Sequence, residues 1–395
     1  MDLWTACRQG DATAVAALLH DDPSLATAKG GPKNREALLD CGFTPALQDP
    51  ATAPAVVACA RLLLEAGADP NLSFLYDSGY REPCPLSALY AASGHSNSPE
   101  LTQLLLDHGA DPDDGESLYH ATEHRDHRCL KLLLDHGARI AGTNALHRML
   151  DFDDLEGLQL MLDAGGDPNA PDNAGSHNAL HHAACRGRDG ATIDLLIAYG
   201  ADVLARDAEG RSPYAKALLH GNTEAATALL RHGAIDDLSP KDRFLAACAC
   251  GDAEYVAQHP FDIGALSADD QRVLPHAASH GHIDAVRLML SLGFDLRTPD
   301  EHGATALHHA CWWGHAACAE ALLRAGAPVD LVDPIYGGDA LGWALHGAES
   351  SSGPRDGHPA VVRLLLEAGA VQSPGGCQSA HEGVQAVLTA WNTQA

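Results

Sequence analysis

The chain has 395 residues, of which 46 % are hydrophobic and 5 % aromatic, and 25 basic against 53 acidic residues give it a net charge of −28. A surface this acidic repels phosphate backbones and anionic lipid, so we expect neither nucleic acid nor a membrane surface as a partner. The sequence contains no apolar run of about 18 residues that would predict a transmembrane helix, and it starts without the charged-then-apolar pattern of a signal peptide, so we expect a cytoplasmic protein.

Eleven cysteines occur along the chain. Several of them, such as Cys248 and Cys250, stand in positions that small residues such as alanine fill elsewhere. This usage favours reduced thiols that pack as small hydrophobic side chains, and it disfavours a disulfide framework.

One phrase, Leu-Leu-x-x-Gly-Ala with close variants, recurs through the sequence. Its glycines are Gly67, Gly109, Gly137, Gly165, Gly200, Gly233, Gly293, Gly326 and Gly369, at spacings of 42, 28, 28, 35, 33, 60, 33 and 43 residues. Repetition near 33 residues indicates one supersecondary unit stacked many times, with each unit contacting its neighbours.

The predicted elements follow this repeat. In chain order they are a helix near 3–19, units over 43–71, 85–113, 115–138, 143–169, 175–203 and 210–236, a degenerate unit at 244–260, units over 271–296, 300–330 and 338–370, and a helix at 379–391.

The unit at 300–330 is the fullest copy. In it, Thr305 is placed to cap a first helix, Gly314 to end that helix and Gly326 to end a second helix. The motif residues are Gly303, Thr305, Leu307, His308, Ala310, Gly314, His315, Leu322, Leu323, Gly326 and Ala327. With these residues the unit resembles an ankyrin repeat. The resemblance covers nearly the whole chain and implies an all-α solenoid of about ten or eleven helix-turn-helix units that binds other proteins.

Irregularities in the repeat predict how the array is divided. The stretch 236–243 precedes the degenerate unit and suggests a bend between an N-terminal sub-array (1–236) and a C-terminal sub-array (237–395) of one continuous solenoid, with a capping helix at each end. Insertions are expected at 26–44, 72–84 and 347–360. Such insertions either contribute to a binding face or are tolerated surface loops.

Basic and aromatic residues recur at one position of the first helix and again four residues later. Residues at this spacing share a helix face, so stacked units would align them in one inner stripe on the concave side of the array. The candidate binding residues are Tyr90, His120, His124, Arg148, His182, Arg186, Lys216, His220, His276, His280, His309, Trp312, Trp313, Trp343 and His346.

Aromatic and cationic groups together suit a protein partner, an acidic peptide or an anionic small molecule. Trp312 and Trp313 are the expected anchors, because exposed tryptophans are favoured at interfaces. The same residue types are also normal on a solvated helix face. His147, His181 and His308 occupy the histidine position of the repeat and are expected to bond backbone near the turns.

The sequence favours a noncatalytic protein without a cofactor or a metal ion. It contains no Gly-x-Ser-x-Gly, P-loop, His-Glu-x-x-His or Cys-x-x-Cys motif. An enzyme that uses the histidine-rich groove for acid–base chemistry stays open as an alternative. A zinc site on a histidine pair also stays open, because His120 with His124, and His276 with His280, each share a helix face.

Overall fold

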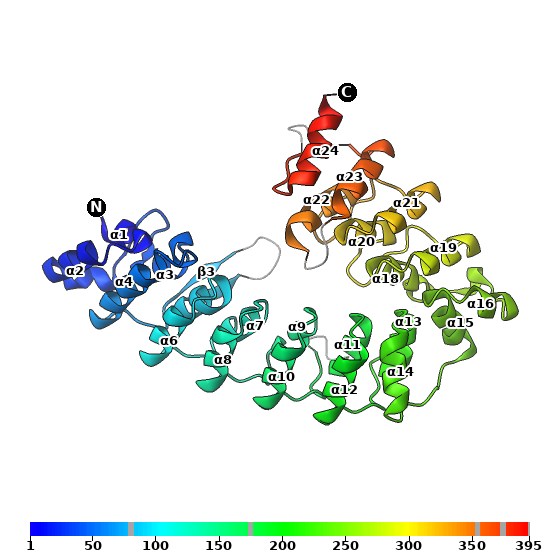
Figure 1. Ribbon diagram of the computed structural model, residues 1–395, viewed down its shortest axis with the longest axis horizontal. Coiled ribbons are helices and arrows are strands. Elements are labelled where there is room, and N and C mark those ends of the chain that lie inside the picture. Colours follow the sequence, from blue (N-terminus) through cyan, green and yellow to red (C-terminus); the bar gives the residue numbers. More distant parts are fainter. Residues whose placement is uncertain (78–82, 173–176, 352–355, 372–376, 394–395) are drawn as a thin grey trace. The chain divides into compact units, whose positions relative to one another are not determined.

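The computed structural model of the chain describes residues 1–77, 83–172, 177–351, 356–371 and 377–393 (Figure 1). It is mostly helical, and strands within the described residues form only two short hairpins. The chain divides into two compact units: unit 1 comprises residues 1–179 and 199–201, and unit 2 comprises residues 180–198 and 202–395. Among the described residues, no helix combines the length and the apolar character that crossing a membrane requires.

Unit 1 consists mainly of paired short helices. They are α1 (Leu3–Gln9), α2 (Ala12–Asp21), α3 (Ala37–Gly42), α4 (Ala53–Glu65), α5 (Ala88–Tyr90), α6 (Pro99–Asp107), α7 (Ser117–Ala121), α8 (Arg128–Asp135), α9 (Ala145–Met149) and α10 (Leu155–Asp163). Short 3₁₀ turns lie at Pro23–Thr27 and Pro45–Leu47, and α5 continues into a π turn at Ala91–His95.

Two of the expected insertions form antiparallel hairpins in unit 1. Strands β1 (Lys29–Gly30) and β2 (Arg35–Glu36) lie within 26–44, together with α3. Strand β3 (Ser73–Tyr76) lies within 72–84 and pairs with β4 (Cys84–Ser87), which extends three residues past that insertion. Residues 78–82 of the second insertion, and 352–355 of the third, lie outside the described residues.

Unit 2 continues the same pattern of helix pairs. Its helices are α11 (Ala179–Cys185, whose first residue still belongs to unit 1), α12 (Gly190–Ala198), α13 (Pro213–Leu219), α14 (Thr223–Arg231), α15 (Pro240–Ala249), α16 (Ala253–Gln258), α17 (Ala268–Gln271), α18 (Val273–Ser279), α19 (Ile283–Leu292), α20 (Ala306–Trp312), α21 (Ala316–Arg324), α22 (Ala340–Ser350), α23 (His358–Glu367) and α24 (Glu382–Asn392). A 3₁₀ turn lies at Ile263–Ala265.

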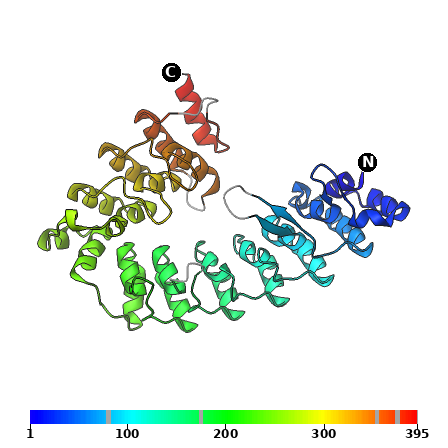
Figure 2. The ribbon, with the colours of Figure 1, turned by 180° about the vertical axis from the view of Figure 1, so that it is seen from behind.

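Within each unit, first helices pack on first helices and second helices on second helices. In unit 2 the first helices α13, α15, α18, α20 and α22 contact one another in that order, and the second helices α19, α21 and α23 do the same. From α13 onward each of these first helices also contacts the second helix of its own pair, as α20 does with α21. The pairs are visible from both sides in Figure 1 and Figure 2. Equivalent positions on successive first helices therefore become neighbours in space.

The unit at 300–330 shows why the sequence folds this way. Ala310 is fully buried where helices approach closely, and Leu322 packs into the same core cluster of unit 2. His308 Nδ1 lies 3.2 Å from the backbone nitrogen and 2.8 Å from the hydroxyl of the N-cap residue Thr305. Gly314, with a φ of +70°, follows the end of α20, as a left-handed residue that ends a helix should. The cap and helix end expected from the sequence are confirmed.

The other predicted elements that can be checked are also present. The degenerate unit expected at 244–260 forms the helix pair α15 and α16, of which α15 begins earlier, at Pro240, and α24 lies where a helix was expected at 379–391. The single helix expected near 3–19 is instead two helices, α1 and α2, because Gly10 with a φ of +74° ends the first. The backbone-bonding role expected of the repeat histidines is confirmed for His181, which donates to the Arg211 carbonyl at 3.1 Å, and for His308, which donates to the Leu331 carbonyl at 3.0 Å.

Candidate functional site

The candidate residues of unit 2 lie on its first helices or directly after them. His182 and Arg186 belong to α11 and the residue following it, Lys216 and His220 to α13, His276 and His280 to α18, His309, Trp312 and Trp313 to α20, and Trp343 and His346 to α22.

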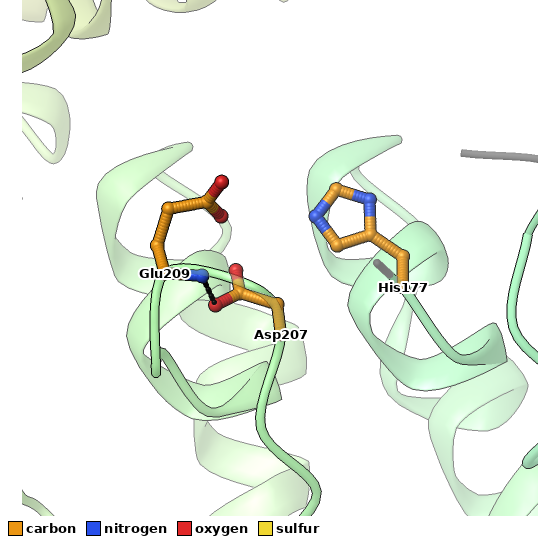
Figure 3. A group of neighbouring side chains, drawn as sticks. All are labelled: His177, Asp207 and Glu209. Atoms are coloured by element: carbon orange, nitrogen blue, oxygen red, sulfur yellow. Dashed lines mark hydrogen bonds between the residues drawn. The ribbon is translucent and has the colours of Figure 1, made fainter. Parts of the chain in front are cut away.

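Lys216, on α13, is buried beside two carboxylates. Its Nζ lies 3.1 Å from Asp207 Oδ2 and 3.6 Å from Glu209 Oε2. Figure 3 shows both carboxylates on one turn, where the backbone nitrogen of Glu209 donates to Asp207 Oδ1 at 3.0 Å. His177, labelled in the same figure, belongs to unit 1 and pairs there with Asp172. Burial alone would raise the pKa of Asp207, but the backbone hydrogen bond from Arg211 and the charge of Lys216 lower it overall.

His220, at the end of α13, and His276, on α18, are in contact although the degenerate unit lies between their helices in the sequence. Their rings stack with centroids 4.1 Å apart and planes inclined by 15°. His276 Nε2 also lies 3.4 Å from Glu301 Oε2. The hydrogen bond from His276 lowers the pKa of Glu301. The stacked pair is therefore linked to the turn that precedes α20.

The same turn holds the next histidine. His309 Nε2 lies 2.7 Å from Oδ2 of Asp300, which is the residue before Glu301. Burial would raise the pKa of Asp300, but the hydrogen bond from His309 lowers it overall. Because Asp300 and Glu301 are consecutive, one turn fixes both His276 and His309.

Trp343 is the centre of an aromatic cluster at the α22 end of the series. Its indole nitrogen donates to Asp333 Oδ2 at 2.8 Å. Its ring centroid lies 5.7 Å from that of Trp312, 5.9 Å from that of His309 and 6.1 Å from that of Tyr336. These edge-to-face contacts, together with the hydrogen bond, fix the indole in one orientation.

Together these residues form a continuous strip within unit 2. Trp312 extends it, because its ring lies 5.3 Å from the ring of the exposed His346. The strip, called the second-unit strip below, comprises Lys216, His220, His276, His309, Trp312, Trp343 and His346.

Other candidate residues of unit 2 lie beside this strip or have a structural role. His182 is half-buried and Arg186 is exposed. His280 Nδ1 donates to the His276 carbonyl at 2.9 Å, and burial lowers its pKa to about 4. Trp313 is half-buried at the end of α20, and its ring contacts no other aromatic ring of the described chain. The two adjacent tryptophans therefore differ, and Trp312 is the one that joins the aromatic cluster.

The candidate residues of unit 1 form a separate group. The rings of Tyr90 and His120 lie 5.1 Å apart, and Glu123 accepts from both His120 at 3.2 Å and Arg148 at 2.8 Å. Burial would raise the pKa of Glu123, but these two hydrogen bonds lower it overall. His124 donates to the Gly94 carbonyl at 2.7 Å and so helps to join two turns.

Two kinds of residue at these sites could not be identified from the sequence. The carboxylates Asp207, Asp300 and Glu123 pair with the candidate cations, but in the sequence they look like ordinary turn or helix-end residues. Unit 1 also contains a cluster in which the Arg35 guanidinium lies 4.8 Å from the Phe43 ring centre and 5.1 Å from that of Phe74. Residues 26–44 and 72–84 do not follow the repeat, so the positions of these side chains could not be predicted from equivalent residues in other units.

In the histidine pairs considered for zinc, each ring has at least one nitrogen engaged with another group. His124 and His280 each donate to a backbone carbonyl, and both ring nitrogens of His120 lie 3.2 Å from glutamate oxygens. Burial raises the pKa of the Cys311 thiol, which opposes the thiolate form that binds metal. The carboxylates Asp207 and Glu209 could also bind a cation, but the ammonium group of Lys216 already lies 3.1 Å and 3.6 Å from them.

Comparison with known proteins identifies the repeat. A family described as ankyrin repeats (3 copies) matches the chain at residues 55–144, 86–172, 146–242 and 244–333. These matches cover most of the sequence and include every first helix that carries the second-unit strip except α22.

Individual relatives share only part of their length with the chain. The probable E3 ubiquitin-protein ligase XBOS33 of Oryza sativa subsp. japonica is 39 % identical over 93 residues, which is 24 % of this chain and 16 % of the relative. The ankyrin repeat protein nuc-2 of Neurospora crassa is 29 % identical over 174 residues, 43 % of this chain and 13 % of the relative. The human SMC5-SMC6 complex localization factor protein 1 is 32 % identical over 100 residues, 25 % of this chain and 9 % of the relative. The chain thus spans less than a fifth of each of these relatives.

Proposed function

Because this chain belongs to the ankyrin-repeat family, we propose that it is a noncatalytic recognition protein whose second-unit strip and adjoining turns bind a protein or peptide partner. Ankyrin repeats generally mediate protein–protein interaction, and stacked repeats offer extended surfaces for it. The fold alone does not determine the function, so the argument for this chain depends on the strip.

The observation that carries the proposal is the physical continuity of the strip. Lys216 and His220 lie one helical turn apart, where the His220 backbone nitrogen donates to the Lys216 carbonyl at 3.0 Å. From His220, side-chain contacts run through the stack with His276, the Asp300–Glu301 turn and His309 to Trp343. An extended surface of this kind suits an extended partner, whereas a small-molecule site needs a closed concave pocket. The hollow lined by Arg287, Leu290, Glu320 and Arg324 is on α19 and α21, and none of these residues belongs to the strip.

An acidic peptide is the partner that the sequence suggested, and an anionic small molecule was the alternative. Both would be attracted by Lys216 and by the histidines of the strip. Both would also compete with carboxylates of the chain itself, because Lys216 and His309 already have acidic partners at 3.1 Å and 2.7 Å. Desolvating such a pair without replacing it is unfavourable. The basic end of the strip is therefore a weaker candidate for the main contact than its aromatic end.

The finer organisation is also part of the proposal. We propose about ten or eleven helix-turn-helix units in one continuous solenoid, with sub-arrays at 1–236 and 237–395, and a cytoplasmic location in keeping with the cysteine usage. Seven of the eleven cysteines are buried, and burial raises the pKa of the Cys248 thiol to about 12, as expected for packing residues.

Affinity capture with the full chain tests the proposed function. The double substitution Trp312→Ala and Trp313→Ala should weaken capture of the partner about tenfold or more, because partly exposed tryptophans are favoured anchors at interfaces and truncating such an anchor costs binding energy. The matched control is Ile235→Ala, since Ile235 is a 57 % exposed apolar residue in another turn of unit 2. Unchanged capture by the double variant, with helicity by circular dichroism also unchanged, would rule out the strip as the recognition surface.

A further inference from the structure

We propose that the aromatic end of the second-unit strip binds a segment of the partner in which a lysine or arginine lies next to apolar residues. This inference rests on the proposed function and names the chemistry of the partner at that surface. It is carried by three features of residues 330–346: a rigid turn with exposed apolar side chains, a fixed indole, and a local surplus of carboxylates.

The turn between α21 and α22 is held by one buried aspartate. Asp333 Oδ1 accepts from the backbone nitrogens of Ile335 at 2.9 Å and Tyr336 at 2.6 Å, and Oδ2 accepts from Gly338 at 2.9 Å. Backbone bonds from Asp333 to Gly338 at 3.0 Å and from Gly337 to Asp333 at 3.1 Å close the same loop. A turn fixed in this way loses little conformational entropy when a partner binds.

This rigid turn exposes large apolar side chains. Val332 is 54 % exposed, Ile335 50 % and Tyr336 59 %. Tyr336 is in ring contact with Trp343, so the exposed side chains of the turn adjoin the half-buried indole. Exposed apolar groups gathered beside an aromatic cluster are typical of an interaction surface.

The stretch of chain that forms this surface is acidic. No lysine or arginine occurs in the sequence between Arg324 and Arg355, whereas Asp330, Asp333 and Asp339 all fall in that interval. Arg355 lies outside the described residues. Asp339 is the N-cap of α22, one turn before Trp343, and a Cβ on the neighbouring Gly338 would lie 2.9 Å from Cδ1 of the indole. A cationic side chain of the partner would therefore meet aromatic faces and carboxylates together, which favours cation–π contact and charge pairing.

The other end of the strip does not offer this combination. There the carboxylates Asp207 and Glu209 already pair with Lys216. Among the described residues, by contrast, no lysine or arginine forms an ion pair with Asp330 or Asp339. The acidic surplus thus lies at the aromatic end, and a partner with a basic segment fits it better than one with an acidic segment.

Four fluorescein-labelled peptides test the inference by fluorescence anisotropy with the full chain. They share one leucine-flanked sequence and carry arginine, lysine, glutamine or glutamate at the centre. We expect the arginine and lysine peptides to bind about tenfold more tightly than the glutamine peptide, and the glutamate peptide more weakly still. Added salt should weaken the two basic peptides selectively.

Charge-removing variants assign the effect to the surface. Asp330→Asn and Asp339→Asn should each weaken the arginine peptide about threefold to tenfold, and asparagine at 339 preserves the helix cap. Tyr336→Ala should weaken the basic and neutral peptides alike. The matched controls are Asp252→Asn, the N-cap of α16 that accepts from Tyr255, and Ile235→Ala. Neither control should change binding.

The outcomes separate this inference from the proposed function. If the glutamate peptide binds as tightly as the arginine and lysine peptides, or more tightly, the inference that the partner segment is basic is wrong. The proposed recognition by the strip would still stand. If Tyr336→Ala weakens binding of the arginine peptide but neither Asp330→Asn nor Asp339→Asn does, the surface binds the peptide through apolar contacts alone. That result would also contradict the inference. If no peptide binds at about 1 mM, the surface does not recognise such segments. Capture that is insensitive to the Trp312 and Trp313 substitutions would instead remove the proposed function itself.

Discussion

The imidazole rings of His220 and His276 stack at 4.1 Å, although the helix pair α15 and α16 lies between them in the sequence. This contact joins α13 to α18 on the strip side, while α15 packs between the same two helices. The degenerate unit therefore does not interrupt the strip, because a side chain at the end of α13 reaches past it.

The stack predicts an energetic coupling between these two histidines. A double-mutant cycle with His220→Ala and His276→Ala should give a coupling of about 0.5–1.5 kcal/mol in urea unfolding, since each single variant already removes the ring contact. A second cycle that combines His220→Ala with His302→Ala provides the control, because the His302 side chain is 66 % exposed. This control cycle should give no coupling. A coupling near zero for His220 with His276 would contradict the stacked geometry.

Stability should fall as the pH falls from about 6.5 towards 4. Burial lowers the pKa of His280 to about 4, and burial also lowers the pKa of His282 and His315. In the unfolded chain these side chains take up protons near pH 6.5, whereas in the folded chain they stay neutral to lower pH, so acid favours unfolding over this window. Their stabilising contribution is complete above about pH 6.5.

Thermal unfolding across that window checks the sign. His280→Gln should flatten the fall in Tm between about pH 6.5 and pH 4, because glutamine has no proton to take up. The variant His302→Gln, at an exposed position, should leave the slope unchanged. A Tm that rises on acidification through this window would show that the buried histidines do not control it.

The buried ion pair between Lys216 and Asp207 predicts a large effect from losing one partner. Lys216→Met should destabilise unit 2 by about 1–3 kcal/mol, because it leaves a buried carboxylate without its cation. The matched control is Arg324→Met, which removes a pair to Glu320 whose side chains are 77 % and 40 % exposed and which should change stability by about 0.5 kcal/mol or less. Equal effects in urea unfolding would contradict the buried pairing.

Alanine substitutions at two glycines distinguish the cost of backbone strain from the cost of steric crowding. Gly314 has a φ of +70°, and a Cβ there would lie 2.8 Å from Nδ1 of His358, whereas a Cβ on Gly326, with a φ of +90°, would meet nothing within 4 Å. Gly326→Ala should therefore destabilise by about 1 kcal/mol, from backbone strain alone, and Gly314→Ala by clearly more. The reverse order of the two free energies of unfolding would refute the close approach of His358.

Much of the fold could be predicted from the sequence because the repeat imposes its own geometry. Helix ends at Gly314, the histidine contacts of His181 and His308, and the helix pair hidden in 244–260 all follow from motif positions. The hairpin at 29–36 and the hairpin at 73–87 could not be predicted, since the insertions that contain or begin them break the regular spacing of the repeat.

The site was predictable only in part, for a related reason. Helical spacing placed Trp343 and His309 on one face, but it could not foresee the carboxylates that pair with the cations. Asp300 and Asp333 are turn residues whose side chains bond backbone, and their second role depends on side-chain directions that no spacing encodes. The different surroundings of Trp312 and Trp313 were hidden in the same way.

Site-specific photo-crosslinking tests the central claim most directly. A benzoylphenylalanine is placed at Tyr336, beside the Trp343 end of the strip, or at Ile235, an equally exposed position in another turn of unit 2. With the captured partner, we expect a strong crosslink from position 336, and little or none from position 235. A crosslink from position 235 with none from position 336 would contradict recognition by the second-unit strip.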